Sequence, residues 1–186
     1  VSTAKIKRIN EDINELDTLV EILLNSARLE QGSVALRRQK NCISDLVMQA
    51  LSQVDLDERY VMMNIEELSI QGDGPLLVRA ITNIFSNIAR YTSNDCTVEI
   101  VAIRSANRLL LRVSDTGEGV VDDFLPQIFT PFTREERSRS KVTGGLGLGL
   151  MFVKKVIVAH GGSIEAVPNQ PNGLTVQMEL PITTSS

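Results

Sequence analysis

The sequence has 186 residues, of which 42% are hydrophobic and 23% are charged, and its formal net charge is −4. This length suits one ordinary domain with an appendage or two small domains, and the hydrophobic content excludes a largely disordered chain. The negative net charge argues against broad binding of nucleic acid.

An amphipathic helix is predicted at the start of the chain. Apolar residues recur at spacings of three and four from Ile6 to Ala27, which is typical of a helix that packs in a bundle. Gly32 is expected to end this helix. A lone helix cannot bury such a stripe, so we expect partner helices from another chain or from a segment outside this sequence.

After residue 32 the pattern favours a compact domain of strands and helices. Strands are expected in "SVALR", in "YVMMNIEELSIQGD" as one or two short strands, in "TVEIVAI" and "RLLLRVSD" as a hairpin joined by "RSAN", and in the alternating "LTVQMELP". Helices are expected over residues 43–54, 74–92 (with Pro75 in the first turn) and 151–160. These elements predict an antiparallel-rich sheet with helices on one face. Cys42 and Cys96 match no metal or redox spacing, and we expect both to be reduced and buried.

The helix predicted from residue 74 carries polar residues along one side. Asn83, Asn87 and Arg90 are spaced by four and three, so they share one helix face. Asparagine is a poor helix former, and its amide oxygen can ligate a hard cation such as Mg²⁺ that is shared with phosphates. A polar face satisfied by water or backbone is the alternative interpretation.

The segment "VSDTGEGV" follows a predicted buried strand and suits the floor of a pocket. Asp115 could accept a hydrogen bond from an exocyclic amine, and Gly117 and Gly119 would let a flat ring lie against the backbone. An ordinary acidic turn is the alternative, because Asp, Thr and Gly are common turn residues.

Two further segments favour a phosphate site with a lid. In "IFTPFTREERSRSK" two phenylalanines flank Pro131 and several basic residues follow, which predicts a mobile lid over residues 134–145 with cationic contacts. In "GGLGLGL" glycines precede a predicted helix, whose unpaired N-terminal N–H groups could receive an anion. A solvated charged loop and a flexible glycine loop are the alternatives.

Taken together and in this order, these segments resemble the ATP-binding domain of sensor histidine kinases, within the superfamily that includes gyrase and the Hsp90 chaperones. "NIFSNIARY", "DTGEG", "IFTPFTR" and "GLGLGL" are similar to the family's N, G1, F and G2 boxes, and the match spans about residues 73–180. "INELDTLVEILLNSARLEQGS" resembles the second helix of the family's dimerisation and phosphotransfer bundle.

The resemblance implies an α+β fold of the Bergerat type, a two-layer sandwich of a mixed, mostly antiparallel sheet with helices on one face. It implies a partial phosphotransfer helix over residues 1–32, an ATP-binding domain over 33–182 and a flexible tail over 183–186. It further implies that ATP and Mg²⁺ bind, with Asp115 at the adenine amino group and Asn83 and Asn87 at the metal. The remaining ATP-binding residues that it implies are Arg90, Tyr91, Gly117, Gly119, Phe132, Arg134, Gly145, Leu146, Gly147, Leu148 and Gly149.

The implied activity is transfer of the γ-phosphate of ATP to a histidine that this sequence does not contain, for relay to a response regulator. The sole histidine is His160, which we expect to serve as a helix C-cap. The resemblance also implies a homodimer through the N-terminal helix. It places this portion in the cytoplasm, with any anchor in the inner membrane supplied by upstream segments.

Two other functions stay open at this point. One is an ATPase of the gyrase or Hsp90 kind, although those enzymes use a glutamate where this chain has Asn83. The other is a non-catalytic dimerisation or partner-binding module with a degenerate pocket. Leu146 favours the second alternative, because the family usually has threonine or serine there. The sequence also departs from the family pattern at Ile88, where alanine is common.

Overall fold

The computed structural model describes residues 35–56, 59–133 and 146–182, together with residues 20, 22–27 and 29. The chain divides into two compact units, residues 1–35 and residues 36–186. In the first unit, residues 20, 22–27 and 29 are helical, and the rest of the predicted N-terminal helix lies outside the described residues. Among the helices of the described part, none has the length and apolar character needed to cross a membrane.

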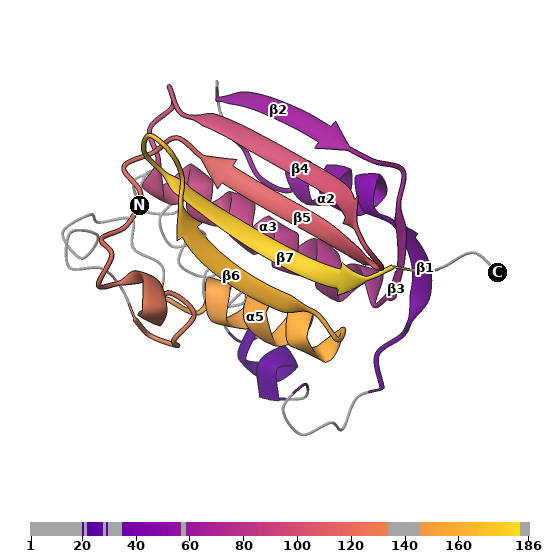
Figure 1. Cartoon of the computed structure of the whole chain (residues 1–186). Coiled ribbons are helices and arrows are strands. Elements are labelled where there is room, and N and C mark those ends of the chain that lie inside the picture. The colour runs from indigo at the N-terminus through magenta and orange to yellow at the C-terminus, as the bar shows by residue number, and fades with distance from the viewer. Residues whose placement is uncertain are drawn as a thin grey trace, which may run out of the picture. The chain divides into compact units, whose positions relative to one another are not determined.

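The second unit is built on a five-stranded sheet with the order β2-β4-β5-β7-β6 (Figure 1). β2 and β4 run parallel, whereas every other neighbouring pair is antiparallel. The prediction of a mixed, mostly antiparallel sheet is therefore confirmed. The strands are β2 (Tyr60–Ile65), β4 (Thr97–Ser105), β5 (Arg108–Asp115), β6 (Ser163–Pro168) and β7 (Leu174–Pro181).

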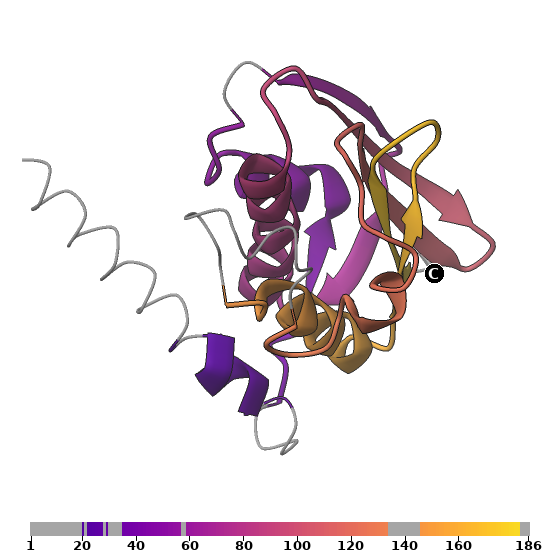
Figure 2. The ribbon, with the colours of Figure 1, turned by 90° about the vertical axis from the view of Figure 1, so that its left-hand side faces the viewer.

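Three helices cover one face of this sheet (Figure 2). They are α2 (Ile43–Leu51), α3 (Gly74–Tyr91) and α5 (Gly149–Ala159), and α3 packs against both of the others. Phe85 of α3 and Phe152 of α5 are completely buried, so the core lies between the helices and the sheet. Pro75 occupies the first turn of α3, as predicted, and α2 ends at Leu51 rather than at residue 54.

A second, two-stranded sheet pairs β1 (Gln39–Cys42) with β3 (Ser69–Gly72) in antiparallel register. The strand predicted in "SVALR" is wrong for its described part, because residues 35–37 form no strand. Here the Arg37 N–H donates instead to Asp73 Oδ2 over 3.1 Å. Cys42 is half-buried rather than buried, because it lies where β1 meets α2, whereas Cys96 is buried as expected.

The hairpin between β4 and β5 delivers Asp115 to the end of the central strand. Its turn is only Ala106 and Asn107, since Ser105 already pairs with Arg108. On β7, Val176, Met178 and Leu180 are buried on one face of the strand, as the alternating pattern predicts. Thr175 on the opposite face is also buried. Its hydroxyl bonds to Ser114 Oγ at 2.9 Å, which satisfies both polar groups.

His160 joins the ends of α3 and α5. It is the C-cap of α5 and is only 2% exposed. Its Nδ1 lies 2.7 Å from the carbonyl oxygen of Val156, and the Asp73 N–H donates to its Nε2 over 2.9 Å. Because Nε2 accepts, the proton lies on Nδ1 and the ring is neutral. Both ring nitrogens therefore serve the fold, in agreement with the predicted structural role.

This neutral histidine predicts that the fold weakens in mild acid. Burial lowers the pKa of His160, and the nearby Arg38 lowers it too, while the Val156 hydrogen bond and Asp73 oppose this. Because the pKa falls on folding, the unfolded chain takes up the proton first. The free energy of unfolding therefore keeps its full value above about pH 6.5, the pKa of a histidine in the unfolded chain. Below that pH it decreases, by up to about 1.4 kcal/mol per pH unit.

Urea unfolding at a series of pH values would measure this effect. We expect the free energy of unfolding to decrease between about pH 6.5 and pH 5, and the His160→Gln variant to lose most of that slope. An equal slope in the variant would assign the acid sensitivity to other groups.

Candidate functional site

Asp115 is a buried carboxylate at the end of β5. It is 7% exposed, and its Oδ1 accepts a hydrogen bond from the Gly117 N–H at 2.8 Å. Burial raises the pKa of Asp115, and the N–H groups of Gly117 and Leu174 partly offset this rise. A buried carboxylate that keeps acceptor capacity is suited to hold a donor group of a ligand.

The loop after Asp115 packs backbone to backbone against the turn before β7. A Cβ added at Gly119, where φ is +69°, would lie 2.8 Å from the Gly173 carbonyl oxygen. A Cβ at Gly173, where φ is +114°, would lie 1.9 Å from the Asp115 carbonyl oxygen. The same carbonyl accepts a hydrogen bond from Asn169 Nδ2 at 2.7 Å. Only glycines permit this approach, which fixes the position of the carboxylate.

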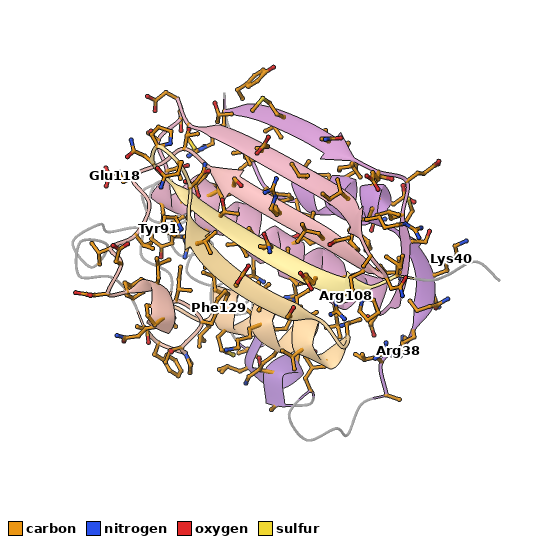
Figure 3. All side chains as sticks on the ribbon, in the orientation of Figure 1. Arg38, Lys40, Tyr91, Arg108, Glu118 and Phe129 are labelled. Carbon is orange, nitrogen blue, oxygen red and sulfur yellow. The ribbon has the colours of Figure 1, made fainter. Side chains whose placement is uncertain are left out.

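A cavity of about 590 Å³ opens beside this loop, a volume typical of small-molecule sites. It brings together three predicted site residues, Arg90 and Tyr91 at the end of α3 and Gly117 after β5. In Figure 3, Tyr91 and Glu118 lie at the same end of the unit. The other lining residues, none of them a predicted site residue, are Thr92, Ser93, Thr116, Glu118 and Asn172.

The start of α5 faces the middle of α3. Its N-cap, Leu148, provides no side-chain hydrogen bond to the first turn. Asn83 Nδ2 donates to the carbonyl of Arg79 over 2.9 Å, and Asn83 Oδ1 would lie 3.1 Å from a Cβ at Gly149. An amide oxygen thus borders a helix N-terminus, where partial positive charge favours an anion.

The "IFTPFT" segment contacts the glycine run directly. Phe132 has φ of 61° and is 66% exposed, and its N–H donates to the Gly147 carbonyl over 3.2 Å. A Cβ at Gly147 would lie 2.6 Å from the Thr133 carbonyl oxygen. Leu148 is buried, whereas Leu146 is 49% exposed. Arg134 and Gly145, with the rest of the predicted lid, lie outside the described residues.

α3 links these two parts of the site. Asn83 faces the start of α5, Tyr91 lines the cavity, and their separation of eight positions along the helix spans about 12 Å. Asn87 lies between them on the same helix face and is half-buried. Within the described segments, no group of three or more His, Cys, Asp or Glu side chains could hold a metal ion.

Comparison with known proteins shows which proteins this chain is similar to. Residues 72–184 match the family described as histidine kinase-, DNA gyrase B-, and HSP90-like ATPase. The sensor protein RstB of Escherichia coli K12 is 30% identical over 187 residues, which cover 98% of this chain and 42% of RstB.

Two solved structures share the fold. The Acinetobacter baumannii histidine kinase AdeS superposes with a TM-score of 0.81 at 19% identity, over 99% of this chain and 87% of AdeS. A full-length ShkA in complex with AMPPNP gives 0.79 at 24% identity, over 98% of this chain and 39% of ShkA. The chain spans less than half the length of the curated relatives it matches, of which RstB is one.

Proposed function

Because the chain belongs to the family of histidine kinase-, DNA gyrase B- and HSP90-like ATPases and is the ATP-binding catalytic portion of a sensor histidine kinase, we propose that it presents the γ-phosphate of ATP to a histidine outside this sequence. One observation carries the proposal. The buried Asp115 carboxylate and an open cavity lie at one end of α3, and the start of α5 contacts Asn83, about 12 Å along α3 from Tyr91.

The base of ATP belongs at the Asp115 end. The carboxylate accepts a hydrogen bond from the adenine amino group, and Gly117 and Gly119 border the ring without a side chain in the way. Tyr91 offers an aromatic face at the cavity. This assignment explains why a carboxylate is kept in a buried position that raises its pKa.

The phosphates belong at the start of α5. Its N–H groups and the helix dipole favour negative charge, and Arg90 supplies a cation from the same face of α3. Asn83 and Asn87 offer neutral amide oxygens, which fit a Mg²⁺ ion that is bound mainly through nucleotide phosphates. The ion would neutralise charge on the phosphates during transfer, and the chain itself would orient the nucleotide. This region is completed by Phe132, Leu146, Gly147, Leu148 and Gly149. Arg134 and Gly145 of the predicted lid, which lie outside the described residues, are proposed as further contacts.

Phosphotransfer fits this site better than hydrolysis of the gyrase or Hsp90 kind. A hydrolase needs a carboxylate to activate water, whereas Asn83 has a neutral amide whose nitrogen already donates to the Arg79 carbonyl. His160 is unsuited as the acceptor, because it is buried and both of its ring nitrogens are engaged. The exposed Leu146 favours a degenerate pocket, and the ATP-binding measurements below test that alternative.

The proposal extends to the intact protein. Residues 1–32 would form part of a dimerisation and phosphotransfer bundle, residues 33–182 the catalytic domain, and residues 183–186 a tail. The phosphorylated histidine would pass its phosphate to a response regulator. Segments upstream of this sequence would carry any membrane anchor, and this portion would work on the cytoplasmic side.

A transfer assay tests this function. With radiolabelled ATP and Mg²⁺, the chain alone is expected to take up no label, because its single histidine is buried. Adding the acceptor bundle of the intact protein should produce acid-labile label on the bundle, and Asn87→Ala should remove that transfer. Steady release of inorganic phosphate without the bundle would instead favour the ATPase, and a melting temperature that ATP leaves unchanged would favour the degenerate module.

A further inference from the structure

We propose that Arg59 is a positioning residue for the nucleotide site, an inference that rests on the proposed function. Arg59 precedes the edge strand β2 and is 7% exposed, and none of the predicted elements or motifs includes it. Its guanidinium holds the C-terminal end of α3 through hydrogen bonds. Four of the eight residues that line the cavity, from Arg90 to Ser93, belong to this helix end.

The contacts of Arg59 are specific. Its Nη2 donates to the carbonyl oxygens of Ala89 at 3.0 Å and Thr92 at 2.8 Å, and its Nε donates to Thr92 Oγ1 at 3.2 Å. Its Nη1 donates to the Leu56 carbonyl at 3.1 Å. The planar fork of the guanidinium thus connects the loop before β2 to the last turn of α3.

α3 ends in a way that requires such a donor. The last carbonyls of a helix have no partner within the helix, and a glycine after the helix commonly resolves this. Here the C-cap is Thr92 in an extended conformation, with φ of −111° and ψ of 158°. Arg59 supplies the missing donors, and its positive charge suits the negative end of the helix dipole.

The hydrogen bonds from Arg59 to Leu56, Ala89 and Thr92, which we call the Arg59 clamp, are connected to Asp115 through Thr92. The Thr92 hydroxyl accepts from Arg59 and donates to the Ile88 carbonyl at 2.7 Å, which fixes the orientation of the side chain. A Cβ at Gly117 would lie 2.7 Å from Thr92 Cγ2 and 2.9 Å from Asp115 Oδ1. A shift of the helix end would therefore move the cavity wall against the residue that holds the base.

Arg59→Lys is the sharpest test, because lysine keeps the charge but has one nitrogen that cannot reach acceptors on Leu56, Ala89 and Thr92 together. Calorimetry with Mg·ATP, at a temperature where the variant is folded, should show a dissociation constant about five- to tenfold higher than that of the native chain.

Arg108→Lys is the matched control. Arg108 also donates to backbone carbonyls, those of Gly161 at 3.0 Å and Glu179 at 3.4 Å, but it lies at the opposite end of β5 from Asp115 (Figure 3). Losing these guanidinium contacts should lower the free energy of unfolding without changing the affinity for ATP. Equal weakening of ATP binding in both variants would overturn the proposal, because it would reflect general destabilisation.

A second measurement needs no nucleotide. The chain has two tyrosines, Tyr60 and Tyr91. Labelling a Tyr60→Phe variant with 3-fluorotyrosine therefore leaves Tyr91, which lines the cavity, as the single ¹⁹F reporter. Arg59→Lys should shift or broaden that resonance, and Arg108→Lys should not. If the native chain binds no ATP, the proposed function fails, yet this resonance still tests the clamp. An unchanged Tyr91 resonance, with ATP affinity within about twofold of native, would refute the role of Arg59.

Discussion

Replacing Asp115 by asparagine is expected to weaken ATP binding by more than about a hundredfold, equivalent to about 3 kcal/mol. The Gly117 N–H holds Oδ1 of this side chain, so an asparagine would direct its remaining amide NH₂ toward the ligand. That NH₂ is a donor and would face the donor amine of adenine. The site would lose an acceptor and gain a repulsive contact.

The same substitution is expected to leave the fold as stable as before, or slightly more stable. Burial raises the pKa of Asp115, which means that the folded state disfavours the ionised form. The ionised carboxylate therefore lowers the free energy of unfolding above the pKa that Asp115 has in the folded state. This loss disappears as the pH falls through that pKa and the carboxylate is protonated. Asparagine removes the charge at neutral pH and keeps the hydrogen bond to Gly117.

Calorimetry for ATP affinity and urea unfolding for stability would separate these two effects. Asp122→Asn is the control, since it removes the same charge from an exposed turn. It should change neither quantity by more than about 0.5 kcal/mol. Native ATP affinity in Asp115→Asn would contradict the assignment of this carboxylate to the base.

The parts of the fold that sequence could predict are those with a strong local pattern. α3 is recognisable because apolar positions recur along an 18-residue helix with Pro75 in its first turn, and the β4–β5 hairpin because two apolar runs flank a short turn. The candidate site residues Asp115, Asn83 and Gly149 stand out because a carboxylate, an amide and a glycine in those positions conflict with local propensity.

The parts that sequence did not predict depend on contacts between distant segments. β1 has little strand character of its own and forms because it pairs with β3, about thirty residues later. The clamp at Arg59 involves a helix end about thirty residues away, and no local pattern marks it. Gly173 follows Asn172, and an Asn-Gly pair indicates a turn but not that the carbonyl of Asp115 packs against it.

Gly173 provides the largest expected effect on stability. Substitution by alanine should lower the free energy of unfolding by about 4 kcal/mol or more, because two penalties combine. Its φ of +114° is unfavourable for any residue with a side chain. In addition, the new Cβ would lie 1.9 Å from the Asp115 carbonyl oxygen, and this neighbour is backbone that cannot rotate away.

Gly161→Ala isolates the first of these penalties. Gly161 also has a positive φ, of +76°, but a Cβ there would meet only Pro181 Cγ at 3.7 Å, an ordinary contact. This control should cost about 1–2 kcal/mol, the conformational part alone. Urea unfolding of both variants gives the difference between them, which is the steric part. Because relief of the overlap must displace Asp115 or the turn before β7, any folded Gly173→Ala protein should also bind ATP more weakly than the Gly161→Ala control. Equal stability of the two variants would contradict the close packing of the Asp115 loop against this turn.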